Sequence, residues 1–353
     1  MQAIGLPDTL EEFDADWFSR ALRAGGHEVT VTAAELVDAI RTTCTKARFR
    51  LAYDRETDLP ETMMLKGGFE PHSERMTEMY QWEARFYAEI APEVPLNLPQ
   101  RFYAGVDPTG WRAATLMEDL NRRNVHFCRA QEPFDFDHVR WRLDMLAALH
   151  AMTWNSPVLQ PGGKWDWVMP RFSEFSDRYN AYYLEPERWQ FYVDSPRGAA
   201  VSVELHDREW MRHALGRLAE LAADEPFCLI HGDTHPGNLY VDADGTPGFL
   251  DPTVSTAPWW LEISYHIVAS FDIANRRRWE GAALAHYLDA LARCGGPRLD
   301  FDHAWLRYRQ GIAYGFFIFI INETQFQTEA TNTAYTARFG IAAVEHGTKD
   351  LLA

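Results

Sequence analysis

The sequence is most informative at residues 228–241, which read CLIHGDTHPGNLYV, and at residues 248–251, which read GFLD. His231, Asp233 and Asn238 follow an apolar strand with the spacing H-x-D-x-x-x-x-N. In phosphoryl transfer, residues with this spacing place a carboxylate beside the acceptor hydroxyl and an amide oxygen on a metal ion. We therefore take Asp233, together with His231, as the candidate catalytic residues.

Asp251 is the candidate partner of Asn238 at a metal site. The pair Asp244-Gly245 between two apolar runs predicts a two-residue hairpin loop. In the register of that loop, Asn238 lies directly opposite Asp251, and opposed Cβ atoms are about 4.5–5.5 Å apart. Amide and carboxylate oxygens suit a hard divalent cation. A two-metal phosphoesterase centre is the weaker alternative, because the residues that directly follow Asn238 cannot bind a metal.

The composition excludes several classes of partner. The chain has 353 residues with 34 basic and 51 acidic side chains, a net charge of −17, which disfavours nucleic acid and anionic membranes as partners. The most apolar run, residues 311–321, is about half the ~20 residues that a membrane span needs. The first 17 residues are acidic, so we expect no signal peptide. Four cysteines without a C-x-x-C pair favour the cytoplasm over a disulfide or zinc framework.

The predicted secondary structure of the chain changes near residue 120. Before it, periodicity predicts strands and two helices; after it, helices dominate around one β-like island at 227–251. The expected strands are 29–32, 47–53, 61–66, 100–105 and 112–117. The expected helices are 14–24, 77–90, 137–154, 172–183, 207–223, 259–274, 279–294 and 301–321. This pattern predicts an α+β fold with a smaller lobe at 1–115, a connector at 116–122 and a larger, mostly helical lobe at 123–353.

The segment His231–Asn238 resembles the H-G-D-x-H-x-G-N signature of the aminoglycoside phosphotransferase-like kinases, which include choline-kinase-like and ecdysteroid-kinase-like branches. The resemblance spans roughly residues 34–271. It implies a bilobal protein-kinase-like fold, ATP or GTP as the phosphate donor, Mg²⁺ held by Asn238 and Asp251, and a hydroxylated small molecule as the acceptor. The acceptor is expected to bind in the helical insertion of the larger lobe.

The same resemblance assigns roles to residues of the smaller lobe. Lys66 resembles the strand lysine that binds the donor's phosphates, and Glu83 resembles its partner on the following helix. Residues 116–120 resemble the hinge, where the backbone of Glu118 and Leu120 meets the adenine edge.

Two departures from the family pattern stand out. The nucleotide loop at residues 41–46 has no glycine, although backbone N–H groups and the hydroxyls of Thr43 and Thr45 can still contact phosphates. Pro252 follows Asp251 where the family has a bulky residue, so the next segment takes a different path. Weak nucleotide affinity or an unusual donor is compatible with these changes.

Other segments are given more ordinary interpretations. Glu262 stands where the family has an Asp that braces the catalytic loop, and His150 is expected to pack. Arg276–Arg278 is interpreted as a solvated helix surface. The aromatic residues concentrated at 165–192 favour an apolar or ring-shaped acceptor over a polycation.

The sequence thus predicts a Mg²⁺-dependent kinase of small-molecule alcohols, cytoplasmic, and a monomer or homodimer. The alternative is a catalytically weak or inactive kinase-like protein that binds a metabolite. A protein-kinase role ranks third, because no activation-loop pattern is present. Aminoglycosides or macrolides, choline-like alcohols, sterol-like alcohols and hydroxyacyl thioesters remain candidate acceptors.

Overall fold

The protein is described by a computed structural model over residues 4–108, 110–132 and 134–353. The chain divides into two compact units. Unit 1 comprises Met1–His126 and Asp242–Thr253, and unit 2 comprises Phe127–Val241 and Val254–Ala353. Each unit is described by itself below. The predicted lobe and connector boundaries stay a prediction.

Unit 1 is built on a five-stranded antiparallel sheet with the strand order β1-β2-β3-β5-β4. Its strands are β1 (Val31–Arg41), β2 (Thr45–Tyr53), β3 (Thr62–Gly67), β4 (Arg101–Val106) and β5 (Ala113–Glu118). Its main helices are α1 (Ala15–Ala24) and α2 (Thr77–Arg85), and a π-helical turn at Phe86–Ile90 directly continues α2.

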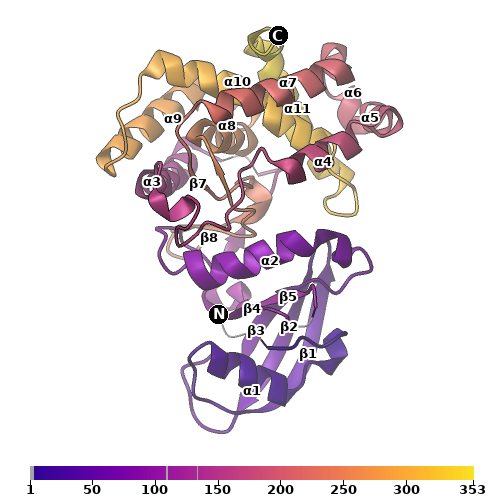
Figure 1. Cartoon of the computed structure of the whole chain (residues 1–353), viewed down its shortest axis with the longest axis vertical. Coiled ribbons are helices and arrows are strands. Elements are labelled where there is room, and N and C mark those ends of the chain that lie inside the picture. The colour runs from indigo at the N-terminus through magenta and orange to yellow at the C-terminus, as the bar shows by residue number, and fades with distance from the viewer. Residues whose placement is uncertain (1–3, 109, 133) are drawn as a thin grey trace. The chain divides into compact units, whose positions relative to one another are not determined.

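The two helices of unit 1 cover opposite faces of the sheet. Successive residues of a strand point to opposite faces. Leu65 is fully buried in a core that contains Trp17 and Phe18 of α1. The next residue, Lys66, forms an ion pair with Glu83 of α2. The strands accordingly run between α1 and α2 in Figure 1.

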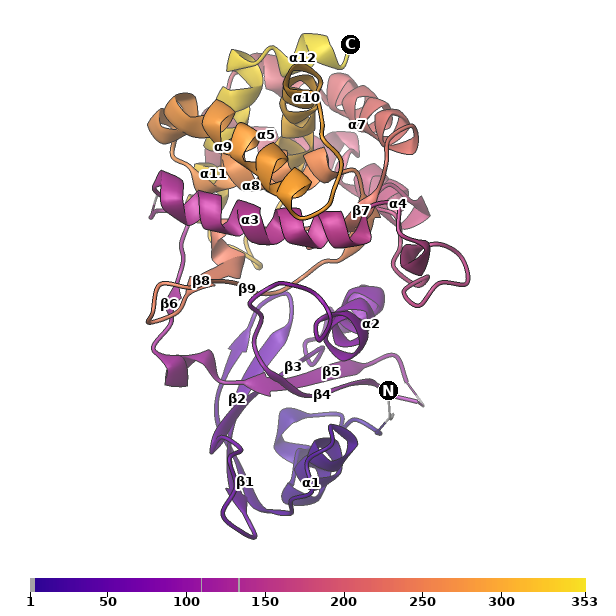
Figure 2. The same cartoon turned by 90° about the vertical axis from the view of Figure 1, so that its left-hand side faces the viewer.

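Unit 2 is mainly helical. Its long helices are α3 (Phe136–Thr153), α7 (Arg208–Ala223), α8 (Trp259–Ser270), α9 (Ile273–Arg293), α10 (Phe301–Ile320) and α11 (Glu329–Glu345). Its shorter helices are α4 (Glu174–Tyr183), α5 (Pro186–Val193), α6 (Pro196–Ala199) and α12 (Thr348–Leu351). Every residue of α8 is buried, so this helix is the centre of the unit, and α3 and α9 pack alongside it (Figure 2). The predicted α+β class is confirmed.

Short strands and turns complete the two units. In unit 2, β7 (Cys228–Ile230) pairs antiparallel with β10 (Ser255–Ala257). Three further short strands are β6 (His126–Phe127), β8 (Leu239–Val241) and β9 (Pro247–Phe249). Short 3-10 turns lie at Leu10–Glu12, Ser73–Met76, Leu120–Arg123, Pro157–Leu159, Val203–His206 and Pro236–Asn238. Within the described residues, no helix has the length and apolar content that a membrane span requires.

Several elements differ from the sequence prediction, and β1 and α11 differ most. β1 runs to Arg41 instead of ending at Thr32, and α11 was not predicted. Residues 33–36, Ala-Ala-Glu-Leu, favour helix, and their strand conformation comes from pairing with β2. Residues 329–345 are rich in Thr and contain Gly340, so their helical propensity is weak, and packing against α10 compensates.

The hairpin loop after β8 also differs from the prediction. It contains three residues, 243–245, because the N–H of Asp242 donates to the carbonyl of Thr246 at 2.8 Å. The N–H of Gly245 donates to the carbonyl of Asp242 at 2.8 Å, and Gly245 has φ +88°. This geometry is a type I turn followed by a left-handed glycine. The expected two-residue loop, and the register derived from it, are therefore wrong.

The interpretation of Arg276 as a solvated residue is also wrong. Its side chain is 1% exposed and contacts Glu280 of the same helix at 2.8 Å and Glu345 of α11. Tyr308 of α10 donates to Glu280 at 2.8 Å. The buried charges are thus paired, and the cluster joins α9, α10 and α11. Arg277, 57% exposed, and Arg278, also exposed, match the predicted solvated surface.

Candidate active site

The candidate catalytic loop leaves a fully buried strand and turns at a glycine. β7 ends at Ile230, and Gly232 has φ +85°, a conformation that favours glycine. Glu262 of α8 lies beneath this turn, where Oε1 accepts from the N–H of Gly232 at 2.7 Å and Oε2 accepts from the N–H of His231 at 3.2 Å. The carboxylate therefore stabilises the backbone of the loop directly before Asp233.

Glu262 is held in turn by a buried histidine. His150 Nε2 lies 2.9 Å from Glu262 Oε2, and its Nδ1 lies 2.8 Å from the hydroxyl of Tyr287. Burial alone would raise the pKa of Glu262, but the hydrogen bond and charge of His150 outweigh it and lower the pKa. The Glu262 carboxylate is therefore ionised at neutral pH.

The carboxylate of Asp233 is held by two donors. Tyr265 of α8 donates its phenol to Oδ1 at 2.7 Å, and Asn238 donates Nδ2 to Oδ2 at 2.7 Å. His235 Nε2 lies 3.6 Å from Oδ2. Burial by itself would raise the pKa of Asp233, but His235 and the hydrogen bond from Tyr265 together lower it. Asp233 is thus an oriented, ionised carboxylate with a side chain 28% exposed.

Residues downstream of Asp233 are fixed by α8 and α11. His266 Nδ1 lies 2.9 Å from the carbonyl oxygen of Thr234, so the ring nitrogen donates. His235 accepts from the N–H of Gly237 at 3.0 Å and packs against Tyr335 of α11 with the two rings tilted and their centroids 5.2 Å apart. These contacts fix the loop on both sides of the candidate base.

A second charged cluster lies in unit 1. Lys66 Nζ contacts Glu83 of α2 and lies 2.9 Å from Asp251 Oδ1. Lys46 Nζ lies 2.6 Å from Asp251 Oδ2. Burial opposes ionisation of Asp251, but the two ammonium groups hold the pKa of its carboxyl well below its usual range. Asp251 has φ +50°, a left-handed conformation that is uncommon for a non-glycine residue.

The glycine-free loop between β1 and β2 is bound to its own unit. The carbonyl of Thr43 accepts from the hydroxyl of Tyr80 at 2.5 Å and lies 3.3 Å from His72 Nε2. Thr45 is fully buried, and its hydroxyl donates to Glu70 Oε1 at 2.7 Å. The carbonyl of Thr43 and the hydroxyl of Thr45 therefore already have partners within unit 1.

The predicted hinge residue Glu118 also has partners within unit 1. Its N–H donates to the carbonyl of Gln100 at 2.9 Å, and its Oε1 accepts from the N–H of Gln100 at 2.7 Å. Leu120 begins a 3-10 turn capped by Asp119. Asp119 forms an ion pair with Arg48 of β2 at 3.0 Å, so β2 and the residues after β5 are joined by charge.

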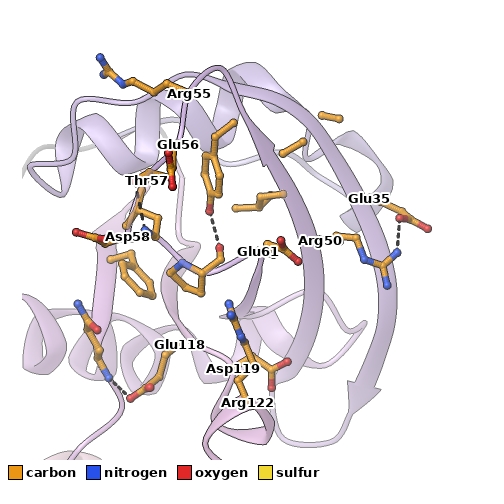
Figure 3. Close-up of a pocket in the computed structure, with 18 residues that line it drawn as sticks. Glu35, Arg50, Arg55, Glu56, Thr57, Asp58, Glu61, Glu118, Asp119 and Arg122 are labelled. Carbon is orange, nitrogen blue, oxygen red and sulfur yellow. Dashed lines mark hydrogen bonds and ion pairs between the residues drawn. The ribbon is translucent and has the colours of Figure 1, made fainter.

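A polar cavity of about 880 Å³ lies beside this hinge segment, between it and the connection from β2 to β3 (Figure 3). Its lining includes three guanidinium groups and a larger number of carboxylates: Glu35, Glu56, Asp58, Glu61, Glu118 and Asp119. A lining with excess negative charge repels phosphate. The cavity is therefore unsuited to the phosphates of a donor nucleotide.

The structure thus gathers the predicted residues into two groups. His231, Asp233 and Asn238 share one loop of unit 2, while Lys66, Glu83 and Asp251 share one cluster of unit 1. A metal shared by Asn238 and Asp251 would join residues of both units and stays a prediction. The roles of Thr43, Thr45, Glu118 and Leu120 also stay predictions.

Sequence reasoning missed two site residues. Tyr265 follows Glu262 by three positions, which places both on one face of α8, so the helix period could have found it. Lys46 lies opposite Lys66 in the paired strands, a relationship that requires the register of β2 and β3. Among the described residues, no three or more His, Cys, Asp or Glu side chains are grouped so that they could hold a metal ion.

The sequence profile of the phosphotransferase enzyme family matches residues 48–300, which is more than half of the chain. The chain therefore belongs to the phosphotransferase enzyme family. This membership makes it a small-molecule phosphotransferase and confirms the predicted family. No sequence among the curated proteins matches this chain.

Solved structures of related enzymes resemble the chain along most of its length. Choline kinase LicA from Streptococcus pneumoniae is 12% identical, with 90% of this chain and 93% of that chain covered and a TM-score of 0.47. Macrolide 2'-phosphotransferase MphH from Brachybacterium faecium is 15% identical, with 91% and 97% covered and a TM-score of 0.44. Aminoglycoside phosphotransferase APH(3'')-Id from Streptomyces rimosus is 14% identical, with 83% and 97% covered and a TM-score of 0.45. The family assignment rests on the sequence match alone.

Proposed function

We propose that the protein transfers the γ-phosphate of ATP or GTP to a hydroxyl group of a small molecule, with Asp233 as the catalytic base. The observation that carries the proposal is the carboxylate of Asp233, which is ionised and oriented by Tyr265 and Asn238 on a braced backbone. Phosphoryl transfer demands mainly positioning and charge stabilisation, so a fixed carboxylate is the group that the acceptor hydroxyl needs.

Asp233 acts on the acceptor in this proposal. Its carboxylate accepts a hydrogen bond from the hydroxyl, which aligns the oxygen for attack, and takes the proton as the O–P bond forms. Both oxygens already accept a hydrogen bond from the protein. A carboxylate oxygen can accept more than one hydrogen bond, so the hydroxyl can bind without displacing Tyr265 or Asn238.

Lys66 acts on the donor in this proposal. Its ammonium binds phosphate oxygens, and Glu83 holds the side chain in place from α2. The pair needs no rearrangement of the fold, because both partners are already in contact within unit 1. This contact supports the role that the family resemblance assigns to the two residues.

Asn238 and Asp251 are the residues that would hold Mg²⁺. Their fit to this ion comes from donor chemistry: Asn238 uses its Nδ2 as a donor to Asp233, which leaves Oδ1 as the oxygen for a cation, and Asp251 is ionised. Mg²⁺ commonly takes one or two protein oxygens and completes its coordination with phosphate and water. When bound, the ion supplies positive charge that neutralises the donor's phosphates.

The test is a turnover screen with ATP and GTP against hydroxylated metabolites, scored by formation of the nucleoside diphosphate and the phosphorylated product. Asp233→Asn keeps the shape of the side chain but cannot take a proton, and it should lower kcat by about 10²- to 10⁴-fold. Asp289→Asn, at an exposed position of α9, is the matched control and should leave kcat unchanged. Full activity of the Asp233→Asn variant would reject the assignment of the base.

A second candidate function is that of a weakly active or inactive metabolite-binding protein. The observation that favours it is the loop between β1 and β2, which has no glycine and in which the hydroxyl of Thr45 is already bonded to Glu70. Nucleotide binding measured with and without Mg²⁺ separates the two functions. A protein that binds its metabolite but binds no nucleotide in either condition belongs to the second class.

A further inference from the structure

Two lysines face each other across neighbouring strands of the sheet in unit 1. Lys46 of β2 is paired in register with Lys66 of β3, so both side chains project from the face covered by α2. Opposed side chains in a sheet have Cβ atoms about 4.5–5.5 Å apart, and like charges at this distance destabilise the pair. The arrangement therefore needs negative charge between the two ammonium groups.

Asp251 supplies that negative charge in the structure as it stands. Its Oδ2 lies 2.6 Å from Lys46 and its Oδ1 lies 2.9 Å from Lys66. Lys66 has Glu83 as a second partner, so two ammonium groups are balanced by two carboxylates. Asp251 is also the proposed metal ligand, and its carboxylate cannot serve a metal and neutralise both lysines at once. Phosphate oxygens provide the charge that is then missing.

The use of lysine at positions 46 and 66 also supports phosphate binding at this site. Of the 34 basic side chains, only four are lysine, at positions 46, 66, 164 and 349, and the remainder are arginine. Two of the four lysines therefore lie opposite each other at this single site. An ammonium group is a compact charge with three rotatable donors, and lysine is a common phosphate-binding residue that acts as a point charge.

The two lysines differ in exposure. The side chain of Lys66 is 7% exposed, and that of Lys46 is 31% exposed. Lys46 is thus the more accessible of the two lysines, while Lys66 is enclosed by its partners. A ligand that enters from solvent can reach Lys46 without any change in the fold of unit 1.

From these observations, we propose that Lys46 is a second phosphate-binding residue, which together with Lys66 binds the polyphosphate chain of the donor. The inference deepens the proposed function and rests on it for the identity of the donor. It assigns to Lys46 a share of the positive charge at the donor's phosphates, beside a loop that has no glycine and whose Thr45 hydroxyl is already bonded to Glu70.

The experiment compares the wild type with Lys46→Met, Lys46→Arg and the control Lys164→Met by titration calorimetry in the presence of Mg²⁺, which engages Asp251. The probes are ATP, inorganic tripolyphosphate and adenosine. Lys46→Met should weaken ATP and tripolyphosphate by about 10- to 100-fold, the value of a hydrogen bond to a charged group. Adenosine, which carries no phosphate, should change by less than about twofold, as should all three probes with Lys164→Met. Lys46→Arg should retain part of the affinity for the two polyphosphates.

Three outcomes overturn the inference. Unchanged affinity of Lys46→Met for both polyphosphates is the first, and equal weakening of ATP and adenosine, which indicates a structural role, is the second. The third is a wild type that binds neither ATP nor tripolyphosphate, and this result also rejects the proposed function. Binding of tripolyphosphate through Lys46 without phosphate transfer from ATP or GTP supports the inference and rejects only the proposed function.

Discussion

Tyr265 and Asp233 are joined by a hydrogen bond of 2.7 Å in which the phenol donates to the carboxylate. The ring of Tyr265 is 3% exposed and stacks on Phe319 of α10 with centroids 5.5 Å apart, so it cannot follow the carboxylate if the latter rotates. The bond therefore holds Asp233 in one orientation, and its removal should affect catalysis before it affects folding.

Tyr265→Phe should lower kcat by about tenfold, the effect of one hydrogen bond to a charged group, and should change the acceptor KM less. Steady-state kinetics on the accepted substrate measures both constants. Tyr308→Phe removes an equally buried bond, from a phenol to Glu280, that involves no residue of the catalytic loop. This control should lose stability and keep its kcat. An unchanged kcat for Tyr265→Phe contradicts the positioning role.

Glu262→Gln should destabilise the protein by about 2–4 kcal/mol, because both oxygens of Glu262 accept hydrogen bonds in a fully buried position. An amide nitrogen in place of one oxygen turns a donor toward the N–H of His231 or Gly232. Denaturant unfolding measures the change. Glu187→Gln, at an exposed position of α5, should stay within about 0.5 kcal/mol of the wild type. A Glu262→Gln variant as stable as this control would show that the hydrogen bonds of Glu262 contribute nothing to the stability of the protein.

His266 should make the stability depend on pH. Burial lowers the pKa of His266 to about 4, although its bond to the Thr234 carbonyl acts in the opposite direction. In the unfolded chain the pKa is about 6.5, so the unfolded state binds the proton first as the pH falls. The stabilisation is therefore complete above about pH 6.5 and decreases toward pH 4, by up to about 3 kcal/mol.

The His266→Asn variant isolates this effect. The Asn amide replaces Nδ1 as the donor to Thr234 but cannot be protonated in this range. Free energies of unfolding at pH 7, 5.5 and 4.5 should fall less steeply for the variant than for the wild type. Parallel slopes for the two proteins would place the pH dependence elsewhere.

Arg276→Met and Arg277→Met should have different effects although the two residues are adjacent in sequence. Arg276 is 1% exposed, and its loss leaves Glu280 buried with one fewer cation, which should cost about 3–5 kcal/mol. Arg277 is 57% exposed, and its ion pair with Glu345 is surrounded by solvent, so we expect little change. Denaturant midpoints at matched slopes test the contrast. Equal effects would contradict it.

Much of the catalytic loop could be predicted from the sequence, because its chemistry is local. His231, Asp233 and Asn238 lie within eight residues, follow a buried strand and belong to the same turn. The family resemblance, together with the order of a strand and then a helix, also predicted Lys66 and Glu83, and the structure places the two in contact. Local patterns and the resemblance thus identified residues that lie close in sequence or in consecutive elements.

Residues that depend on tertiary pairing could not be predicted. Lys46 acquires its position from the register between β2 and β3, which no local pattern in the sequence encodes. The prediction of a solvated Arg276 is wrong, because a charged side chain can be buried only where it finds partners. The partners of Arg276 are Glu280 and Glu345, which lie 4 and 69 positions away. The strand predicted for β1 is too short, because Ala, Glu and Leu favour helix unless a neighbouring strand supplies hydrogen bonds.

The scarcity of lysine has a practical consequence for chemical labelling. An amine-reactive reagent can modify only four side chains, and mass spectrometry of the digested protein would resolve each of them separately. Lys46, 31% exposed, should react far faster than the enclosed Lys66. The rate at which Lys46 is modified therefore measures how accessible its side chain is to solvent. Slower acylation in the presence of a nucleotide would report occupancy without any assay of turnover, and hence before the acceptor has been identified.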